Sequence, residues 1–181
     1  MTNFEARISA HNEFERARRQ AEIDRLGAWL RGRDDRLLPF ETIRRNLRQQ
    51  SPLYRGIHQV PCEAIVGSVG RYDEMTRHFL PLNDSLKNRW VKMVELAQTE
   101  GWPPIEVYKV GDVYFVRDGN HRVSAARQLK FPTIEAHVWE YPDDIVIGPR
   151  DSLDEVLNRF RERVFLEKTG LRERYAVYDI R

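Results

Sequence analysis

The sequence lacks several features that would mark a protein class. Its single cysteine, Cys62, excludes an internal disulfide and any zinc site built from several cysteines. No apolar run approaches the roughly 20 residues of a membrane-spanning helix, and the N-terminus lacks the apolar stretch of a signal peptide. The formal net charge is only +2, which does not demand a nucleic-acid partner. These absences predict a cytoplasmic protein with no membrane partner.

The length and the apolar content predict one domain with appendages. The chain has 181 residues, of which 41% are hydrophobic, which is enough for one core but short for two domains. Changes in pattern divide it into three segments. We expect an N-terminal helical arm over residues 1–55, a central domain over 56–140, and a C-terminal helix and tail over 141–181, packed on the same domain.

The N-terminal segment predicts two helices. Asn3–Leu30 is rich in Glu, Arg and Ala and has an imperfect apolar stripe, which indicates a long, mostly exposed helix. Gly32 to Asp35 breaks it, and a second helix over Phe40–Gln49 would complete a helical hairpin. The arginines here have two interpretations: a solvated helix face paired with acids, or a surface that binds DNA phosphates or another partner. The predicted stripe consists of Phe14, Ala17, Ala21 and Leu26.

The most informative stretch is Val107–Leu129. Alternating residues predict a strand, Gly111-Asp112 a turn, and Val113–Val116 a second strand. Asp118-Gly119 ends that strand, and Asn120–Leu129 is typical of a helix. A helix start offers unpaired backbone N–H groups and the positive end of the helix dipole, and both favour phosphate.

The side chains at this helix start carry their own chemistry. His121 and Arg122 add donors where the backbone already favours an anion, and the carboxylate of Asp118 is suited to a metal ion or a proton. Two of these residues have a structural alternative, Asp118 as a helix cap and His121 as an ordinary structural histidine.

Other elements flank this stretch. Strands are predicted over Ile57–Val60 and Ile134–Trp139, and a helix capped by Asn83 runs to Gln98. Ser152 and Glu155 form the pattern of a capping box, which predicts a helix ending near Lys168.

The segment Asp118–Arg122, followed by Ala125-Ala126, resembles a box found in three related families. It is similar to the Gly-Glu-Arg-Arg box of the ParB N-terminal domain, the Gly-Cys-His-Arg box of sulfiredoxin, and the Asp-Gly-His-Thr-Arg box of ParB-like free-serine kinases. The stretch Cys62–Glu74 resembles the first box of ParB-like domains. Together the resemblance spans about residues 56–140. It implies an α+β fold of the ParB/sulfiredoxin-like type, with a small mixed sheet and surrounding helices, beside the helical hairpin and the C-terminal helix.

Differences from these families reduce the number of activities that the resemblance implies. Asn120 stands where sulfiredoxin has its nucleophilic cysteine, so that chemistry is excluded. Only about 40 residues follow Tyr141, too few for the DNA-binding and dimerisation domains of ParB. The remaining interpretation is a single-domain nucleotide-binding protein. Its more specific version is a phosphotransferase or an NTP hydrolase.

The resemblance also implies a site. The ligand would be ATP, ADP or CTP, or another phosphate-bearing small molecule, with Mg²⁺ held by Asp118. Catalytic roles fall to Asp118, His121 and Glu74, with Asp73 as the alternative to Glu74. Arg71 has a plain alternative as a surface arginine. The residues expected to bind the ligand are Ser68, Gly70, Arg71, Gly119, Asn120, His121 and Arg122.

Two other functions stay open. One is a DNA-binding ParB-like regulator that uses the arginine-rich N-terminal helices. The other is an interaction module that has lost ligand binding. A homodimer is compatible with all three.

Overall fold

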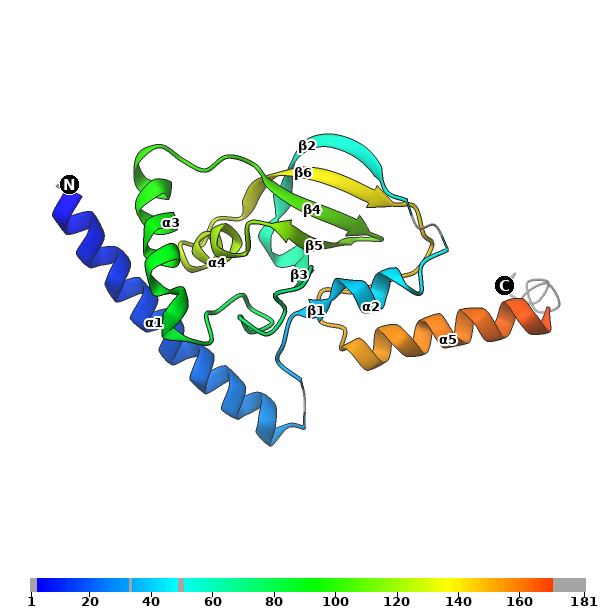
Figure 1. The fold of residues 1–181 in the computed structure, drawn as a ribbon. Helices are drawn as coiled ribbons and strands as arrows, with labels where there is room; N and C mark the ends of the chain where they lie inside the picture. Colours follow the sequence, from blue (N-terminus) through cyan, green and yellow to red (C-terminus); the bar gives the residue numbers. More distant parts are fainter. Residues whose placement is uncertain (1–2, 33, 49–50, 171–181) are drawn as a thin grey trace, which may run out of the picture.

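The computed structural model describes residues 3–32, 34–48 and 51–170. Its centre is a six-stranded mixed sheet in the order β1-β3-β5-β4-β6-β2 (Figure 1). The pairs β1/β3, β3/β5 and β4/β6 are parallel, whereas β4/β5 and β2/β6 are antiparallel. The predicted α+β class with a small mixed sheet is confirmed. The strands are β1 Leu38–Pro39, β2 Leu53–Pro61, β3 Ile65–Ser68, β4 Ile105–Val110, β5 Val113–Asp118 and β6 Thr133–Tyr141.

One face of the sheet is covered by α4 (Asn120–Gln128), and α3 (Lys87–Thr99) and α1 (Asn3–Leu30) lie beyond it (Figure 1). Val123 and Ala126 of α4 pack on Val107 and Val116 of the sheet. The outer helices share a second cluster around Phe14 and Trp90, which meet edge to face.

The opposite face is covered by α2 (Phe40–Arg44) and α5 (Leu153–Thr169). The Phe40 ring stacks on Tyr108 with a centroid distance of 4.7 Å. Val156 and Phe160 of α5 are buried in the same cluster. The capping box of Ser152 and Glu155 forms at the start of α5, as the sequence predicted.

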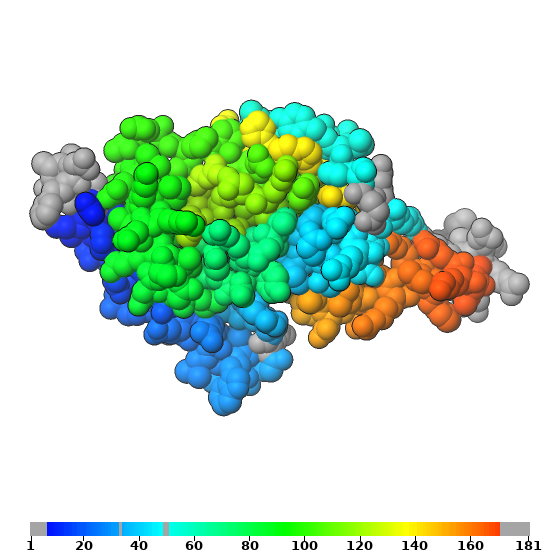
Figure 2. Space-filling model, viewed as in Figure 1, coloured from blue at the N-terminus to red at the C-terminus, as the bar shows by residue number. Residues whose placement is uncertain are grey.

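The N-terminal helices do not pack as the predicted hairpin. The first helix, α1, packs on α3, whereas the second helix, α2, lies on the opposite face of the sheet. Strand β1, which lies between them in the sequence, pairs with β3 and takes the chain from one face to the other. The second helix also ends at Arg44, and the predicted end at Gln49 lies outside the described residues. Leu26 does not belong to the buried stripe: it is 59% exposed, and Ile23, Trp29 and Leu30 are exposed beside it. Figure 2 shows this end of α1 projecting from the body.

Two local predictions need correction at their boundaries. β2 begins at Leu53, four residues before the predicted strand. The helix after Asn83 begins with a short 3-10 turn, η2 (Asp84–Leu86). Asn83 occupies its N-cap position, but the side chain makes no capping hydrogen bond and accepts one from the Ser85 hydroxyl. Within the described part of the chain, no helix combines the length and apolar character that crossing a membrane requires.

Candidate functional site

The two sequence boxes meet at one edge of the sheet. β3 and β5 are parallel neighbours, with Ser68 beside Val116, so the loops that follow them leave from the same edge. Crevices outside the carboxyl ends of parallel strands are common ligand sites. Ser68 is buried, and its hydroxyl accepts a hydrogen bond from Asn120 Nδ2 at 2.9 Å. This contact holds the loop after β3 against the start of α4. We call the region where the two meet the corner.

Gly119 shapes the turn from β5 into α4. Its φ of +116° lies in a region that favours glycine, and a Cβ there would lie 2.5 Å from Cγ2 of Ile105. No side chain caps α4, and the first helical bond runs from Val123 N–H to Gly119 O. The N–H groups of Asn120, His121 and Arg122 are therefore the unpaired donors of this helix start. The alternative reading of Asp118 as a helix cap is not what the structure shows.

Arg122 does not face the open side of this helix start. Its Nη1 donates to the carbonyl oxygens of Pro103 at 2.8 Å and Pro104 at 3.0 Å, and its Nη2 donates to the Asp118 carboxylate. The Arg122 side chain is only 13% exposed. Its guanidinium thus clamps the segment that leads into β4, so the structure does not support the predicted role of Arg122 as a phosphate ligand.

Asp118 takes part in the same contacts through Arg122. Its carboxylate pairs with Arg122, although its side chain remains largely exposed. Among the residues that the structure describes, no group of three or more His, Cys, Asp or Glu side chains could hold a metal ion. A Mg²⁺ ion at Asp118 would therefore rely on oxygens from a bound phosphate and on water.

His121 is the least satisfied side chain of the corner. Both of its ring nitrogens are buried, and neither has a hydrogen-bond partner in the described chain. Burial lowers the pKa of His121, and the positive charges of Arg89 and Arg71 lower it further. The ring is therefore neutral near pH 7 and has one N–H to donate and one nitrogen to accept.

Arg71 and Glu74 lie in the loop after β3. Gly70 turns the backbone there with a φ of +79°, and Arg71 Nη1 lies 3.7 Å from the Glu74 carboxylate. Glu74 Oε2 is buried without a hydrogen bond. Asp73 instead acts electrostatically on Arg36. Of the two acids considered from the sequence, Glu74 is the one that faces Arg71.

Arg89 was missed by the sequence analysis. It lies on α3, is exposed, and acts electrostatically on His121 together with Arg71. Nothing in its local sequence marks it, because only the packing of α3 against α4 brings it to the corner. The resulting site has two arginines and one histidine around an uncapped helix start, with Glu74 as its acid.

Comparisons with known proteins give a partial structural similarity and no match of any other kind. No family model and no curated protein matches the chain. Among solved structures, the chain is similar to the crystal structure of sulfiredoxin from Arabidopsis thaliana, with 25% identity and a TM-score of 0.37. The match covers 48% of this chain and 88% of that one. It bears on neither the ligand nor the activity of this protein.

Proposed function

We propose that the corner binds the phosphate group of a nucleotide or of another phosphorylated small molecule. The observation that carries the proposal is an uncapped nine-residue helix whose second residue, His121, has no side-chain partner in the described chain and feels the charges of Arg71 and Arg89. Each of these features is unfavourable without an anion: the helix start lacks acceptors, and the two arginines depress the pKa of the histidine. A phosphate would relieve all of them.

Each group has a defined role in this proposal. The backbone N–H groups of Asn120 and His121 would donate to phosphate oxygens, and the helix dipole would add a favourable field. Asn120 contributes only its backbone, since its side chain is held by Ser68. Arg71 and Arg89 would neutralise the charge. Arg122 would shape the corner from behind rather than touch the ligand.

Phosphoryl transfer or hydrolysis is the sharper form of the proposal. It would need a base near the phosphate, and Glu74 is the candidate because its carboxylate adjoins Arg71. Such reactions depend mostly on positioning and charge neutralisation, so few further groups are needed. The proposed ligands are ATP, ADP or CTP, with or without Mg²⁺.

A binding experiment tests the proposal. ATP, ADP, CTP and GTP, each with and without Mg²⁺, should include at least one nucleotide that raises the melting temperature in a concentration-dependent way. Arg71→Gln and Arg89→Gln should each weaken its binding by about tenfold or more, since each removes a charge-assisted contact. Both arginines are exposed, so the variants should fold normally.

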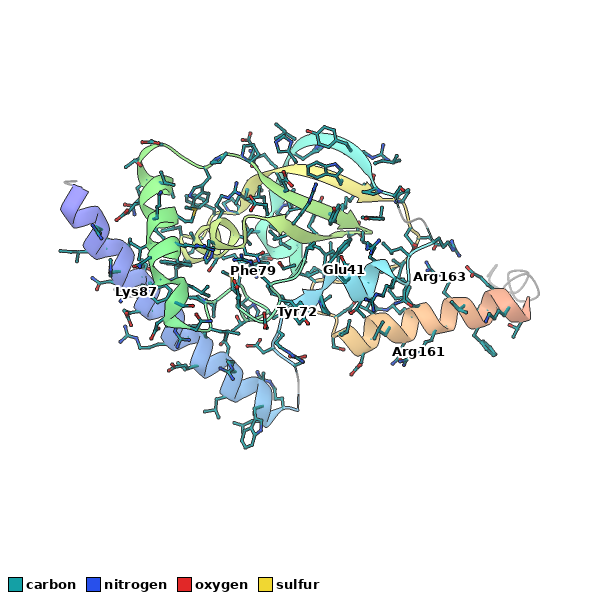
Figure 3. The ribbon with its side chains drawn as sticks, in the orientation of Figure 1. Glu41, Tyr72, Phe79, Lys87, Arg161 and Arg163 are labelled. Atoms are coloured by element: carbon teal, nitrogen blue, oxygen red, sulfur yellow. The ribbon has the colours of Figure 1, made fainter. Side chains whose placement is uncertain are left out.

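Arg161→Gln is the matched control, because Arg161 lies on the outer side of α5, far from the corner (Figure 3). It should bind the nucleotide as the unaltered protein does. The proposal is wrong if no nucleotide raises the melting temperature, or if both corner variants keep full affinity.

The structure favours no second function. On α1, Arg16 pairs with Glu13, and Arg18 pairs with Glu22 and Asp84. This is the pattern of a solvated helix face rather than of a surface reserved for DNA phosphates. DNA binding therefore stays a prediction from the sequence.

A further inference from the structure

A cavity of about 920 Å³ lies at the opposite end of α4 from the corner. Its walls come from α1, from the 3-10 turn η1 (Cys62–Ala64), from the C-terminal end of α4 and from the loop at Pro149-Arg150. Arg127 in its wall follows Asn120 by seven residues, which is about 10 Å along a helix. The volume lies within the range of small-molecule sites, roughly 300–1,000 Å³. The cavity is therefore separate from the proposed phosphate site.

Arg127 is fixed in the cavity wall by neutral groups. Its Nε and Nη2 donate to the Cys62 carbonyl at 3.1 and 2.6 Å, and its Nη2 donates to the Ile65 carbonyl at 2.7 Å. The guanidinium also lies 5.0 Å from the centre of the Phe79 ring. Figure 3 shows Phe79 in the loop beneath α4. No carboxylate of the described chain forms an ion pair with Arg127, so its charge is held in place without being neutralised.

Arg77 lies beside Arg127 and keeps unused donors. Its Nη2 donates to the carbonyls of Pro149 at 3.3 Å and Asp151 at 2.8 Å. Its Nε and Nη1 make no hydrogen bond to any described residue, yet neither is sealed from solvent. Burial and the adjacent charge of Arg127 lower the pKa of Arg77 to about 10. Three N–H bonds of this guanidinium, which lines the cavity, are therefore not used within the described chain.

The acids near Arg77 do not compensate for this charge. Asp151, Asp34 and Asp35 act on Arg77 electrostatically, but none of the three forms an ion pair with it. Asp34 pairs with Arg36, and Asp151 pairs with Arg159. A charge that is partly removed from water and has no ion-pair partner is unfavourable, so a site of this kind favours an anion.

The rim of the cavity extends the positive charge. Lys130 and Arg150 line it, are exposed, and form no ion pair with the part of the chain that the structure describes. Only two acids, Asp24 and Glu63, share the lining with these two residues and with the partly buried Arg77 and Arg127. The cavity thus combines a partly buried guanidinium that has unused donors with a cationic rim.

We infer that this cavity is a second anion-binding site, which takes a phosphoryl group of a small molecule. The free edge of the Arg77 guanidinium would bind two phosphate oxygens, as arginine does in bidentate pairs. Lys130 and Arg150 would close over the remaining charge. The inference is independent of the proposed function, because no residue of the corner lines the cavity.

The test uses the full chain with the corner disabled by Arg71→Gln and Arg89→Gln. In this background, pyrophosphate and ATP are titrated calorimetrically at low ionic strength. Pyrophosphate should still bind, and adding Lys130→Gln and Arg150→Gln should weaken it by at least about tenfold. Tighter binding of ATP than of pyrophosphate would show that the phosphoryl group belongs to a nucleotide, and the reverse order would indicate a smaller phosphorylated ligand.

Arg77→Lys provides the variant that keeps charge but loses the planar fork. It should also weaken pyrophosphate binding, and its melting temperature shows whether the protein is still folded. Pyrophosphate binding that is absent from the corner-disabled protein, or that survives all three cavity substitutions, overturns the inference. Unchanged nucleotide affinity in the corner variants would contradict only the proposed function, so the two failures are distinguishable.

Discussion

At the scale of residues, His121 links the stability of the protein to pH. Its folded pKa lies below the usual value because of burial, Arg89 and Arg71. Between the folded pKa and the unfolded value of about 6.5, the unfolded chain binds more protons than the folded one. The free energy of unfolding should therefore fall as the pH drops from about 6.5 through the folded pKa.

His121→Gln removes this titration, so the decline in stability between neutral and mildly acidic pH should become smaller. Urea unfolding at a series of pH values measures it. A bound phosphate should also raise the pKa of His121, because an anion favours the protonated ring. An identical pH profile in the variant and the unaltered protein would show that His121 does not titrate in this window.

At the scale of elements, the corner depends on how β4, β5 and α4 are tied together. Arg122 joins all three, through the Pro103 and Pro104 carbonyls before β4 and through Asp118 at the end of β5. Arg122→Ala should lower the free energy of unfolding by about 2–4 kcal/mol, since it removes charge-assisted hydrogen bonds from a largely buried group.

Arg71→Ala is the matched comparison, because Arg71 is more than half exposed. Its effect on stability should stay within about 0.5 kcal/mol. The sequence alone had suggested the opposite behaviour for Arg122, namely weaker nucleotide binding with an intact fold. Denaturant unfolding that shows no loss of stability in Arg122→Ala would restore that first interpretation.

The elements themselves were largely predictable where their signals were local. The turn at Gly111, the strand that ends at Asp118 and the capping box at Ser152 all form as the pattern indicated. Each depends on the backbone preferences of a few neighbouring residues. The direction of the Arg122 side chain was not predictable, because its two carbonyl acceptors lie 18 and 19 residues away in the chain.

At the scale of the molecule, apolar clusters lie on both faces of the sheet, and a helix near each end of the chain contributes to one of them. Phe14 of α1 belongs to the outer cluster on the α4 side, and Phe160 of α5 belongs to the cluster on the opposite side. The sequence could show that both helices were amphipathic. It could not show which face of the sheet each would cover, because periodicity identifies a buried side but not its partner.

Helix α4 connects the two proposed sites. Its first turn opens into the corner, and its last turn carries Arg127 into the cavity. Arg89 enters the corner only through the packing of α3, and Arg77 meets Arg127 only through the loop that crosses below α4. Both groups of cations are therefore products of tertiary structure.

The most direct test of the central claim is a ¹H–¹⁵N NMR titration of the full chain with the nucleotide that most raises its melting temperature. Binding at the corner predicts saturable shifts that are largest for the backbone amides of Gly119, Asn120 and His121, accompanied by shifts at Arg71. Saturable binding that leaves these amides unmoved would contradict the placement of the phosphate at the start of α4.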